Sequence, residues 1–410
     1  MKRIFSLLFC VSLLLGLWGC QGQTGEQAII SQPYYTGAVG NSCTVFDGGA
    51  VYRKNLDNYL HVLDFSTGKA DIFCSRPNCL HNDSTCNGYG EDDLSSFFTA
   101  GNKLYYLKSL DPELDPEINA YRVKCELMVS DLNRQNEQKI GTLNGLWAAI
   151  RVYFWENSAF LFIMDSPISS SNDLKETLYL VEIDLVSNKI KEPIKVSDEF
   201  SNIVQNVAGV YEGELYFETC YMVEPISAFS DVSQISHESA YWRYNVKNGK
   251  LKQAESALPD HAPPAAETGS VIAFNNGYCI IGDPFNYAPL SVLNLSNWEV
   301  TPLCDKGALC FSYGSFLYFV KEEPNGTFTP DRYRFNTSTG EIETVYSSAE
   351  KFPVGSIGSG IIGENEEYFY YSSSTAYSGA IDGYEEGSPL ICRAKKDEIT
   401  TPGYHAEITY

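Results

Sequence analysis

Three cysteines and one histidine are clustered within thirteen residues, in the pattern Cys74-x4-Cys79-x-His81-x4-Cys86. Thiolates and imidazole are the ligands that tetrahedral zinc prefers, and four such ligands complete a closed structural site. A disulfide is the alternative, joining Cys86 to Cys74 or to Cys79, with Cys43 available as a fourth cysteine. Free or reactive thiols are a third reading. The pattern therefore predicts that this segment is held compactly by a cross-link, and it leaves open whether structural zinc or a disulfide forms that cross-link.

The familiar catalytic motifs do not occur in the sequence. There is no Gly-x-Ser-x-Gly elbow, and the glycine-rich stretch 355–360 lacks the Lys-Ser/Thr ending of a phosphate-binding loop. The five histidines lie far apart along the chain. We therefore assign no catalytic residue.

The charge of the chain restricts its partners. Acidic residues outnumber basic residues 52 to 29, which gives a formal net charge of -23. Such a surface repels the phosphate backbone of nucleic acids, so a nucleic-acid partner is not expected.

The N-terminus resembles a bacterial lipoprotein signal. Lys2 and Arg3 precede an apolar stretch, 4–17, that is shorter than the roughly 20 residues a membrane-spanning helix needs. The following Leu-Trp-Gly-Cys, which ends at Cys20, resembles a lipobox, although Trp18 stands where a small residue is usual. The resemblance implies that residues 1–19 are removed, that Cys20 carries the lipid, and that 20–40 is a polar tether. An ordinary secreted protein is the alternative. We expect the protein on the extracytoplasmic side of the cell membrane.

The rest of the chain repeats one pattern of strands and turns. Strands rich in Tyr, Phe, Leu and Val recur, and polar turns that open with Asp or Asn and close with Gly or Asn separate them. The clearest turns are Asp64–Lys69, Asp184–Lys189, Asn245–Lys250 and Asn336–Glu341. First strands are expected near residues 43, 96, 147, 203, 270, 308 and 355. The mean spacing of about 52 residues is typical of four-stranded propeller blades with inserted loops.

We therefore predict an all-β fold over residues 41–410, a single closed β-propeller of about seven four-stranded blades. Six or eight blades, or a pair of β-sandwiches, are the structural alternatives. An outer strand for the last blade could come from 406–410 or from 27–31.

The Tyr/Phe-rich strand followed by Asp64-Phe-Ser-Thr-Gly68-Lys69 resembles the β-propeller lipoproteins of Gram-positive gut anaerobes, often described as TolB-like or as domains of unknown function. The resemblance covers roughly residues 40 to 400. It implies the architecture, and it implies no established activity and no catalytic residues.

The long connections of the repeat are expected on one face. Six of them, irregular segments that include 109–122, join a second strand to a third. The seventh, the Cys/His-rich segment 74–94, joins the first blade to the second. Insertions on one face of a repeat scaffold are where binding surfaces are usually built, although neutral variation of loops would look the same. The aromatic residues predicted on this binding face are Tyr121, Phe229, Tyr241, Phe285, Tyr287, Phe328, Tyr377 and Tyr384.

These features favour a non-enzymatic binding or scaffold protein that uses the loop-rich face for a protein, peptide or glycan ligand. An extracytoplasmic hydrolase or lyase acting on glycans or peptides is one alternative, because propellers host such enzymes. A metal-dependent sensor or chaperone is another.

Overall fold

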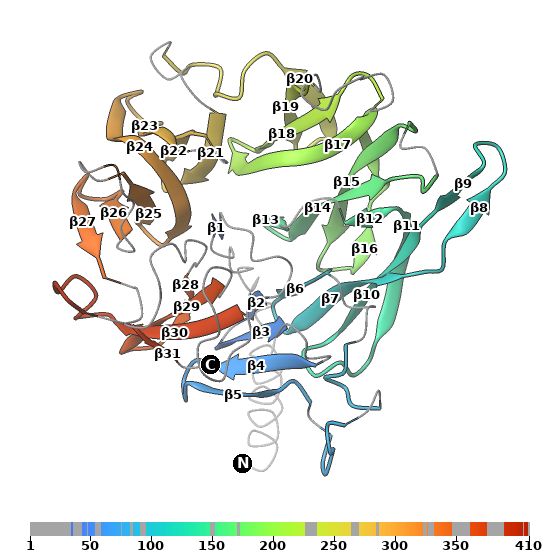
Figure 1. Cartoon of the computed structure of the whole chain (residues 1–410), viewed down its shortest axis with the longest axis horizontal. Coiled ribbons are helices and arrows are strands. Elements are labelled where there is room, and N and C mark those ends of the chain that lie inside the picture. Colours follow the sequence, from blue (N-terminus) through green and yellow to red (C-terminus); the bar gives the residue numbers. More distant parts are fainter. Residues whose placement is uncertain are drawn as a thin grey trace, which may run out of the picture.

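The computed structural model describes a chain whose regular elements are all β-strands (Figure 1). The described residues are 34–35, 43–46, 48–53, 59–74, 76–82, 85–90, 96–147, 152–169, 173–225, 236–263, 270–283, 287–322, 326, 332–346, 361–374, 389–404 and 406–408. Within them we find no helix, and hence none long and apolar enough to span a membrane. Cys20 lies outside the described residues.

The strands form antiparallel four-stranded units that succeed one another along the chain. The first unit contains β2 (Cys43–Phe46), β3 (Gly49–Arg53), β4 (Leu60–Asp64) and β5 (Lys69–Ile72). The second contains β6 (Ser96–Ala100), β7 (Lys103–Ser109), β10 (Lys124–Asp131) and β11 (Gln138–Asn144). The third contains β12 (Leu146–Trp147), β13 (Tyr153–Trp155), β14 (Ser158–Asp165), β15 (Glu176–Asp184), β16 (Lys189–Ile190) and the first part of β17 (Ile194–Tyr211).

Two long strands each serve two units. The second part of β17 begins the fourth unit, with β18 (Glu214–Met222), β19 (Glu238–Asn245) and β20 (Lys250–Ala254). The fifth contains β21 (Ser270–Asn275), β22 (Tyr278–Gly282), β23 (Ala288–Asn294) and the first part of β24 (Val300–Tyr313). The sixth contains the rest of β24, β25 (Phe316–Lys321), β26 (Arg332–Asn336) and β27 (Ile342–Val345). The seventh contains β28 (Ile361–Glu364), β29 (Tyr368–Ser374), β30 (Pro389–Lys395) and β31 (Glu407–Ile408).

Three short strands lie outside this series. β8 (Glu113–Asp115) and β9 (Ala120–Arg122) form a hairpin in the segment 109–122, which we had predicted to be irregular. That prediction was wrong, because Leu114 and Tyr121 pair across the hairpin. β1 (Tyr34–Tyr35) pairs with β24, so one point of the predicted tether is hydrogen-bonded to the sixth unit.

The polar turns have the local chemistry that the sequence indicated. In the first unit the Asp64 Oδ1 accepts hydrogen bonds from the backbone N–H groups of Ser66 (2.7 Å) and Thr67 (3.2 Å), and Gly68 closes the turn at a φ of 64°. The same arrangement recurs at the turns opened by Asp184, Asn245, Asn294 and Asn336. In the fifth unit Trp298 takes the closing position at a φ of 61°, which is unusual for so large a side chain.

The strand faces explain how the units hold together. In β14 the side chains of Phe160 and Phe162 pack toward the fourth unit, while those of Leu161 and Ile163 pack toward the second. Both faces of the sheet are therefore buried, which is why this strand is a continuous apolar run rather than an alternating one. Seven apolar clusters of this kind occur among the described residues, each between two neighbouring units.

One of these clusters joins the first unit to the seventh. The rings of Phe65 and Tyr370 stack with centroids 5.2 Å apart, and the Tyr370 hydroxyl donates a hydrogen bond to the Phe65 carbonyl (3.0 Å). The Asn365 side-chain amide donates to the same carbonyl (2.8 Å). In the described part of the chain, side chains rather than a shared strand make this junction.

The architecture confirms the predicted all-β propeller with seven four-stranded units, arranged around a common centre (Figure 1). The described first strands begin at or near the expected positions, and β31 supplies the outer strand of the last unit from the C-terminal segment. That the ring is closed stays a prediction.

The contact between the first and seventh units gives a first prediction. A Cβ built on Gly363 would overlap the Phe65 ring. We expect Gly363→Ala to lower the free energy of unfolding by about 1–3 kcal/mol, because overpacking displaces the ring. In a Phe65→Ala background the same substitution is expected to cost little, since the obstructing ring is gone. Urea unfolding of the four proteins measures both effects, and an equal cost in the two backgrounds would contradict the packing described.

Candidate metal centre

The Cys/His segment begins directly after β5 and turns back sharply. The backbone N–H of Cys79 donates to the Arg76 carbonyl (3.3 Å), which closes a turn over Pro77 and Asn78. Proline suits the second position of such a turn, and Asn78 has the positive φ, 59°, that a type II turn requires at the third. His81 also has a positive φ, 51°. These two reversals bring side chains that are separated in sequence to one point.

The four predicted ligands converge. One ligand atom from each of Cys74, Cys79, His81 and Cys86 lies within 4.8 Å of all the others. The Nδ1 atom of His81 is 3.2 Å from the Cys86 Sγ. Zinc bonds of about 2.0–2.3 Å place tetrahedral ligands about 3.3–3.8 Å apart, so a small contraction would give a zinc centre. The three thiols are free in the structure.

The protein environment shifts the pKa values of Cys74 and Cys86 in opposite directions. Burial raises the pKa of the Cys86 thiol to about 11. Burial also acts to raise the pKa of Cys74, but hydrogen bonds from the backbone of Arg76 and Asn87 and from the side chains of Cys86 and Cys79 together lower it. Of Cys74 and Cys86, Cys74 is therefore nearer to the thiolate form that metals bind.

The end of the segment is fixed to the first unit by its backbone. The Leu60 N–H at the start of β4 donates to the Gly88 carbonyl (2.8 Å), and Tyr59 and Tyr89 form a β-bridge with their rings 5.3 Å apart. A Cβ at Gly88 would lie 2.8 Å from the Phe73 carbonyl oxygen, so the close approach requires glycine.

The same end is also fixed to the second unit. The Arg134 guanidinium, in the turn between β10 and β11, donates to the carbonyls of Tyr89 (2.6 Å) and Asn87 (3.3 Å). The Asn87 side chain donates in turn to the Asn133 carbonyl (3.2 Å). The four-residue cluster thus sits beside a bridge between two units.

The position of the cluster differs in part from our expectation. We predicted it among the long loops on one face, but the segment reaches the tight β10–β11 turn of the next unit and lies at the outer edge of the ring (Figure 1). The sequence pattern does not show which turn of the next unit the segment reaches.

The predicted aromatic binding face is described only in part. Tyr121 lies in β9 with 49% of its surface exposed, and Tyr287 precedes β23 with 39% exposed. Tyr241 lies within β19, paired with Glu218, and not in a loop as we predicted. The other five positions, Phe229, Phe285, Phe328, Tyr377 and Tyr384, lie outside the described residues.

One polar residue escaped the sequence analysis. Glu218 interrupts the apolar run of β18 and is only 5% exposed. A charged residue at a position that strand alternation assigns to a buried face was the available signal.

Comparisons with known proteins are uninformative about function. No protein-family model matches the chain, and no curated protein matches it. Among solved structures, the chain is similar to the β-propeller domain of the Trilobed protease from Pyrococcus furiosus (11% identity, TM-score 0.41, 92% of this chain and 98% of that one). It is also similar to an acylaminoacyl peptidase from Pyrococcus horikoshii (10%, TM-score 0.45, 88% and 52%) and to an oligogalacturonate lyase from Vibrio parahaemolyticus (13%, TM-score 0.41, 90% and 91%). The chain spans about half the length of the peptidase. Likenesses this distant support no conclusion about activity.

The contacts of Arg134 give a second prediction. Arg134→Gln should speed hydrogen exchange at the amides of Leu60 and Tyr89, because the Gly88 region loses its charge-assisted hydrogen bonds to the second unit. The loss of unfolding free energy should be about 1–3 kcal/mol. Lys139→Gln is the matched control, since the ion pair of Lys139 among the described residues is with Glu126 of the same unit. Equal exchange rates in both variants would show that Arg134 does not hold the segment.

Proposed function

We propose that this protein is a lipid-anchored, extracytoplasmic β-propeller that binds or scaffolds a partner, and that a structural zinc ion at Cys74, Cys79, His81 and Cys86 ties its first two units together. The observation that supports the zinc centre is the convergence of four ligand atoms within 4.8 Å. The partner is a protein, peptide or glycan, and nucleic acid is not expected because the net charge is -23.

The ligand set supports a structural rather than a catalytic ion. Three thiolates and one imidazole fill the four positions of tetrahedral zinc and leave no position for a substrate or an activated water. Cys86 is only 4% exposed, which protects the centre on one side. A bound zinc ion would neutralise the charge of the thiolates and would hold the four ligating residues in fixed positions.

The surrounding segment explains why a tie is needed. Between β5 and β6 the chain carries few apolar side chains that could hold it by burial, and Leu80, between two proposed ligands, is 81% exposed. Ordering such a segment costs about 1–2 kcal/mol of backbone entropy for each residue. Ligand bonds to zinc would offset this cost without a hydrophobic core.

The anchor and the ligand face rest on the sequence. The lipobox-like Leu-Trp-Gly-Cys20 supports lipidation and attachment to the outer side of the cell membrane. Tyr121 and Tyr287, both well exposed beside the long connections, support a binding surface on that face.

The zinc centre gives a third prediction. The purified chain should bind one zinc ion, measured by elemental analysis after dialysis against a metal buffer. Loss of an outer-shell contact already weakens a zinc site about 10- to 100-fold, so Cys79→Ser and His81→Ala should weaken it more than about 100-fold. Cys220→Ser is the matched control, because Cys220 is also a partly exposed free thiol and lies in β18, far from the cluster in sequence. Full zinc content in Cys79→Ser, with the strands intact by circular dichroism, would refute the assignment.

The anchor gives a fourth prediction. Mass spectrometry of the membrane fraction of cells producing the full chain should detect an N-terminal peptide that begins at a diacylglyceryl-modified Cys20. A Cys20→Ala variant should be released from the membrane or remain unprocessed. An intact Trp18-Gly19-Cys20 peptide in the mature protein would contradict lipidation.

A further inference from the structure

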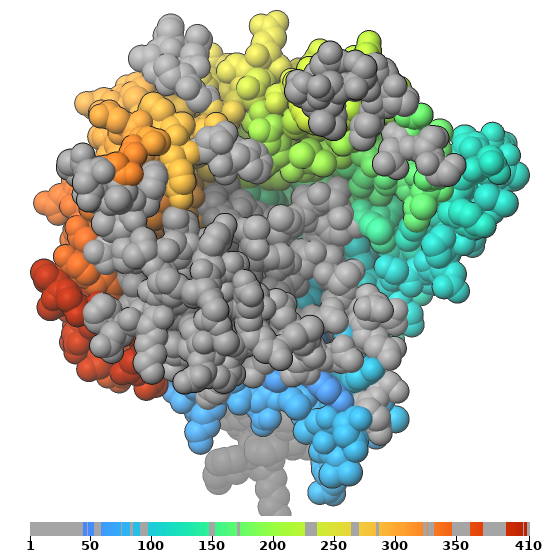
Figure 2. Space-filling model, viewed as in Figure 1, coloured from blue at the N-terminus to red at the C-terminus, as the bar shows by residue number. Residues whose placement is uncertain are grey.

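The hairpin of β8 and β9 projects from the edge of the ring (Figure 1), and Figure 2 shows its atoms, in cyan, standing out beside the neighbouring units. It lies in the connection between β7 and β10, which is one of the long insertions. β9 meets a second insertion, the connection between β14 and β15. There the Tyr121 N–H donates to the Ile168 carbonyl (2.9 Å), and the Ile168 N–H donates to the Tyr121 carbonyl (2.7 Å). Insertions from two neighbouring units thus form one small sheet.

One face of this small sheet is apolar. Leu114 lies opposite Tyr121, and Tyr121 lies opposite Ile168. Side chains of directly opposed residues in antiparallel strands point to the same face, so these three form a row, which we call the hairpin face. Their exposed fractions are 53%, 49% and 52%. Apolar side chains that are exposed singly are ordinary, whereas adjacent ones on a projecting element are typical of an interaction surface.

The opposite face of the hairpin is polar and holds the hairpin in place. Asp115 follows Leu114 in β8, so its side chain points away from the hairpin face. Arg122 donates to Asp115 (2.9 Å) and to Asp165 at the end of β14 (2.6 Å). These ion pairs connect the hairpin to the third unit, so the hairpin face is presented in a defined orientation.

The outer edge of β8 is protected against the addition of another strand. Because the Tyr121 backbone bonds to Ile168, the backbone groups of Leu114, opposite Tyr121, point to the free edge. The residues two positions away on each side are Pro112 and Pro116, which have no N–H. Proline at such positions blocks pairing along an edge. A partner is therefore expected to contact the side chains of the hairpin face and not the backbone of β8.

The charge around the hairpin face is negative. The segment 109–124 carries four carboxylates and two cationic side chains, Arg122 and Lys124, and both cations are engaged in ion pairs. Asp111, before β8, and Glu117, in the turn after it, are exposed, and neither has an ion pair in the described part of the chain. These two carboxylates lie beyond the two ends of β8 and therefore flank Leu114. They would attract Lys or Arg on either side of a docked apolar residue.

The same charge disfavours the other occupants of such a surface. A second copy of the chain would bring an equally acidic hairpin, and each chain has a formal net charge of -23. An anionic bilayer attracts basic segments and would repel this one. A basic segment of a different protein has the complementary charge.

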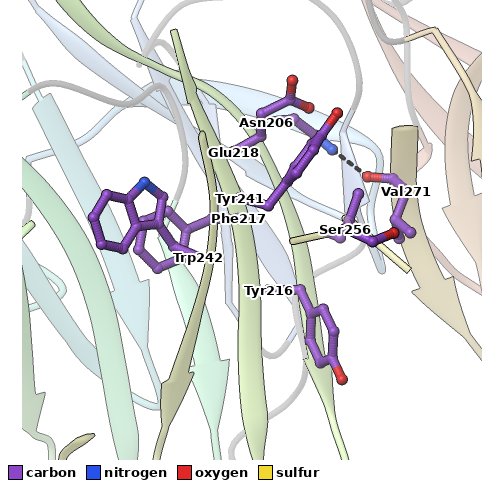
Figure 3. Close-up of a pocket in the computed structure, with 10 residues that line it drawn as sticks. Asn206, Tyr216, Phe217, Glu218, Tyr241, Trp242, Ser256 and Val271 are labelled. Atoms are coloured by element: carbon purple, nitrogen blue, oxygen red, sulfur yellow. Dashed lines mark hydrogen bonds between the residues drawn. The ribbon is translucent and has the colours of Figure 1, made fainter. Parts of the chain in front are cut away.

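The pocket between the fourth and fifth units is no alternative site for such a partner (Figure 3). Residues of β17, β18, β19 and β21 contribute to its lining, Glu218 among them. It encloses about 10 Å³, the space of about one water molecule. A side chain of a docked protein does not fit there, so the partner requires an exposed surface.

We propose that the hairpin face docks a segment of a partner protein in which an aliphatic or aromatic side chain is flanked by Lys or Arg. The apolar side chain packs on Leu114, Tyr121 and Ile168 and supplies most of the affinity, as buried anchors do at interfaces. The flanking cations face Asp111 and Glu117, where they speed association and select the partner. This inference rests on the proposed binding function and names the class of partner that it serves.

The test uses the full-length mature chain and a library of random peptides displayed on phage. We expect the enriched peptides to carry Lys or Arg next to aliphatic or aromatic residues. One of them, synthesised and titrated by calorimetry, is the probe. Ile168→Ser should weaken its binding at least about tenfold, since an aliphatic side chain is no longer buried by the peptide. Ile342→Ser is the matched control, because Ile342 of β27 is similarly exposed (45%) and belongs to the sixth unit.

The same titration tests the role of the charges. Asp111→Asn combined with Glu117→Gln should weaken binding about two- to fivefold at low salt and flatten its salt dependence, since exposed ion pairs are weak and screened. Circular dichroism should show intact strands in every variant, because substitutions at exposed positions cost little stability.

Several results would overturn the proposal. Unaltered binding by Ile168→Ser, or an equal loss in Ile342→Ser, would remove the assignment to the hairpin face and leave the proposed binding function intact. Enriched peptides without basic residues would contradict the stated partner. A library from which no peptide is enriched would exclude a peptide segment, while the proposed function would still allow a glycan. A wild-type dimer that Ile168→Ser converts to a monomer in sedimentation would show that a second copy covers this face.

Discussion

Each four-stranded sheet of this protein has two apolar faces, and burying both of them is the constraint on which the other features depend. A single small sheet cannot bury its faces alone, so every unit must pack on a neighbour at each side. In β14 the phenylalanines face one neighbour and the intervening aliphatic residues face the other. The cluster of Phe65 and Tyr370 provides the same contact between the ends of the series. Because these contacts between neighbouring units supply the stability, the connections between strands can vary in length and sequence.

The proposed zinc centre lies where this apolar packing gives way to polar groups. At the outer edge between the first and second units, the chain leaves β5 and is held by backbone hydrogen bonds, by Arg134 and by the Cys/His cluster. A zinc ion there would hold a polar segment in place, as side-chain burial holds the strands. Because the site lies at a boundary between two units, a single ion would restrain both sheets.

The local chemistry of the sequence was sufficient to predict the fold. Asp64 and Gly68 define a turn through their own hydrogen bonding and backbone conformation, and such turns mark where strands end. The cluster from Cys74 to Cys86 was also recognisable, because its ligands are close together in the chain. Features that depend on distant segments were harder to predict. Tyr241 was assigned to a loop because the end of the preceding connection carries no signal, and it lies in β19.

The continuity of β17 and β24 across two units could not be predicted for a related reason. A bend within a strand leaves the strand pattern unbroken, so the sequence does not show where one sheet ends and the next begins. The pocket lined by Glu218 combines residues from β17, β18, β19 and β21. Only the fold brings these segments together.

The central claim is that the Cys/His cluster is a zinc centre that ties the first two units. X-ray absorption at the zinc edge of the purified, zinc-loaded chain tests it most directly, because the spectrum reports the ligand atoms themselves. The account predicts three sulfur ligands at about 2.3 Å and one nitrogen ligand at about 2.0–2.1 Å. A spectrum with only oxygen and nitrogen ligands, or with fewer than three sulfur ligands, would contradict it.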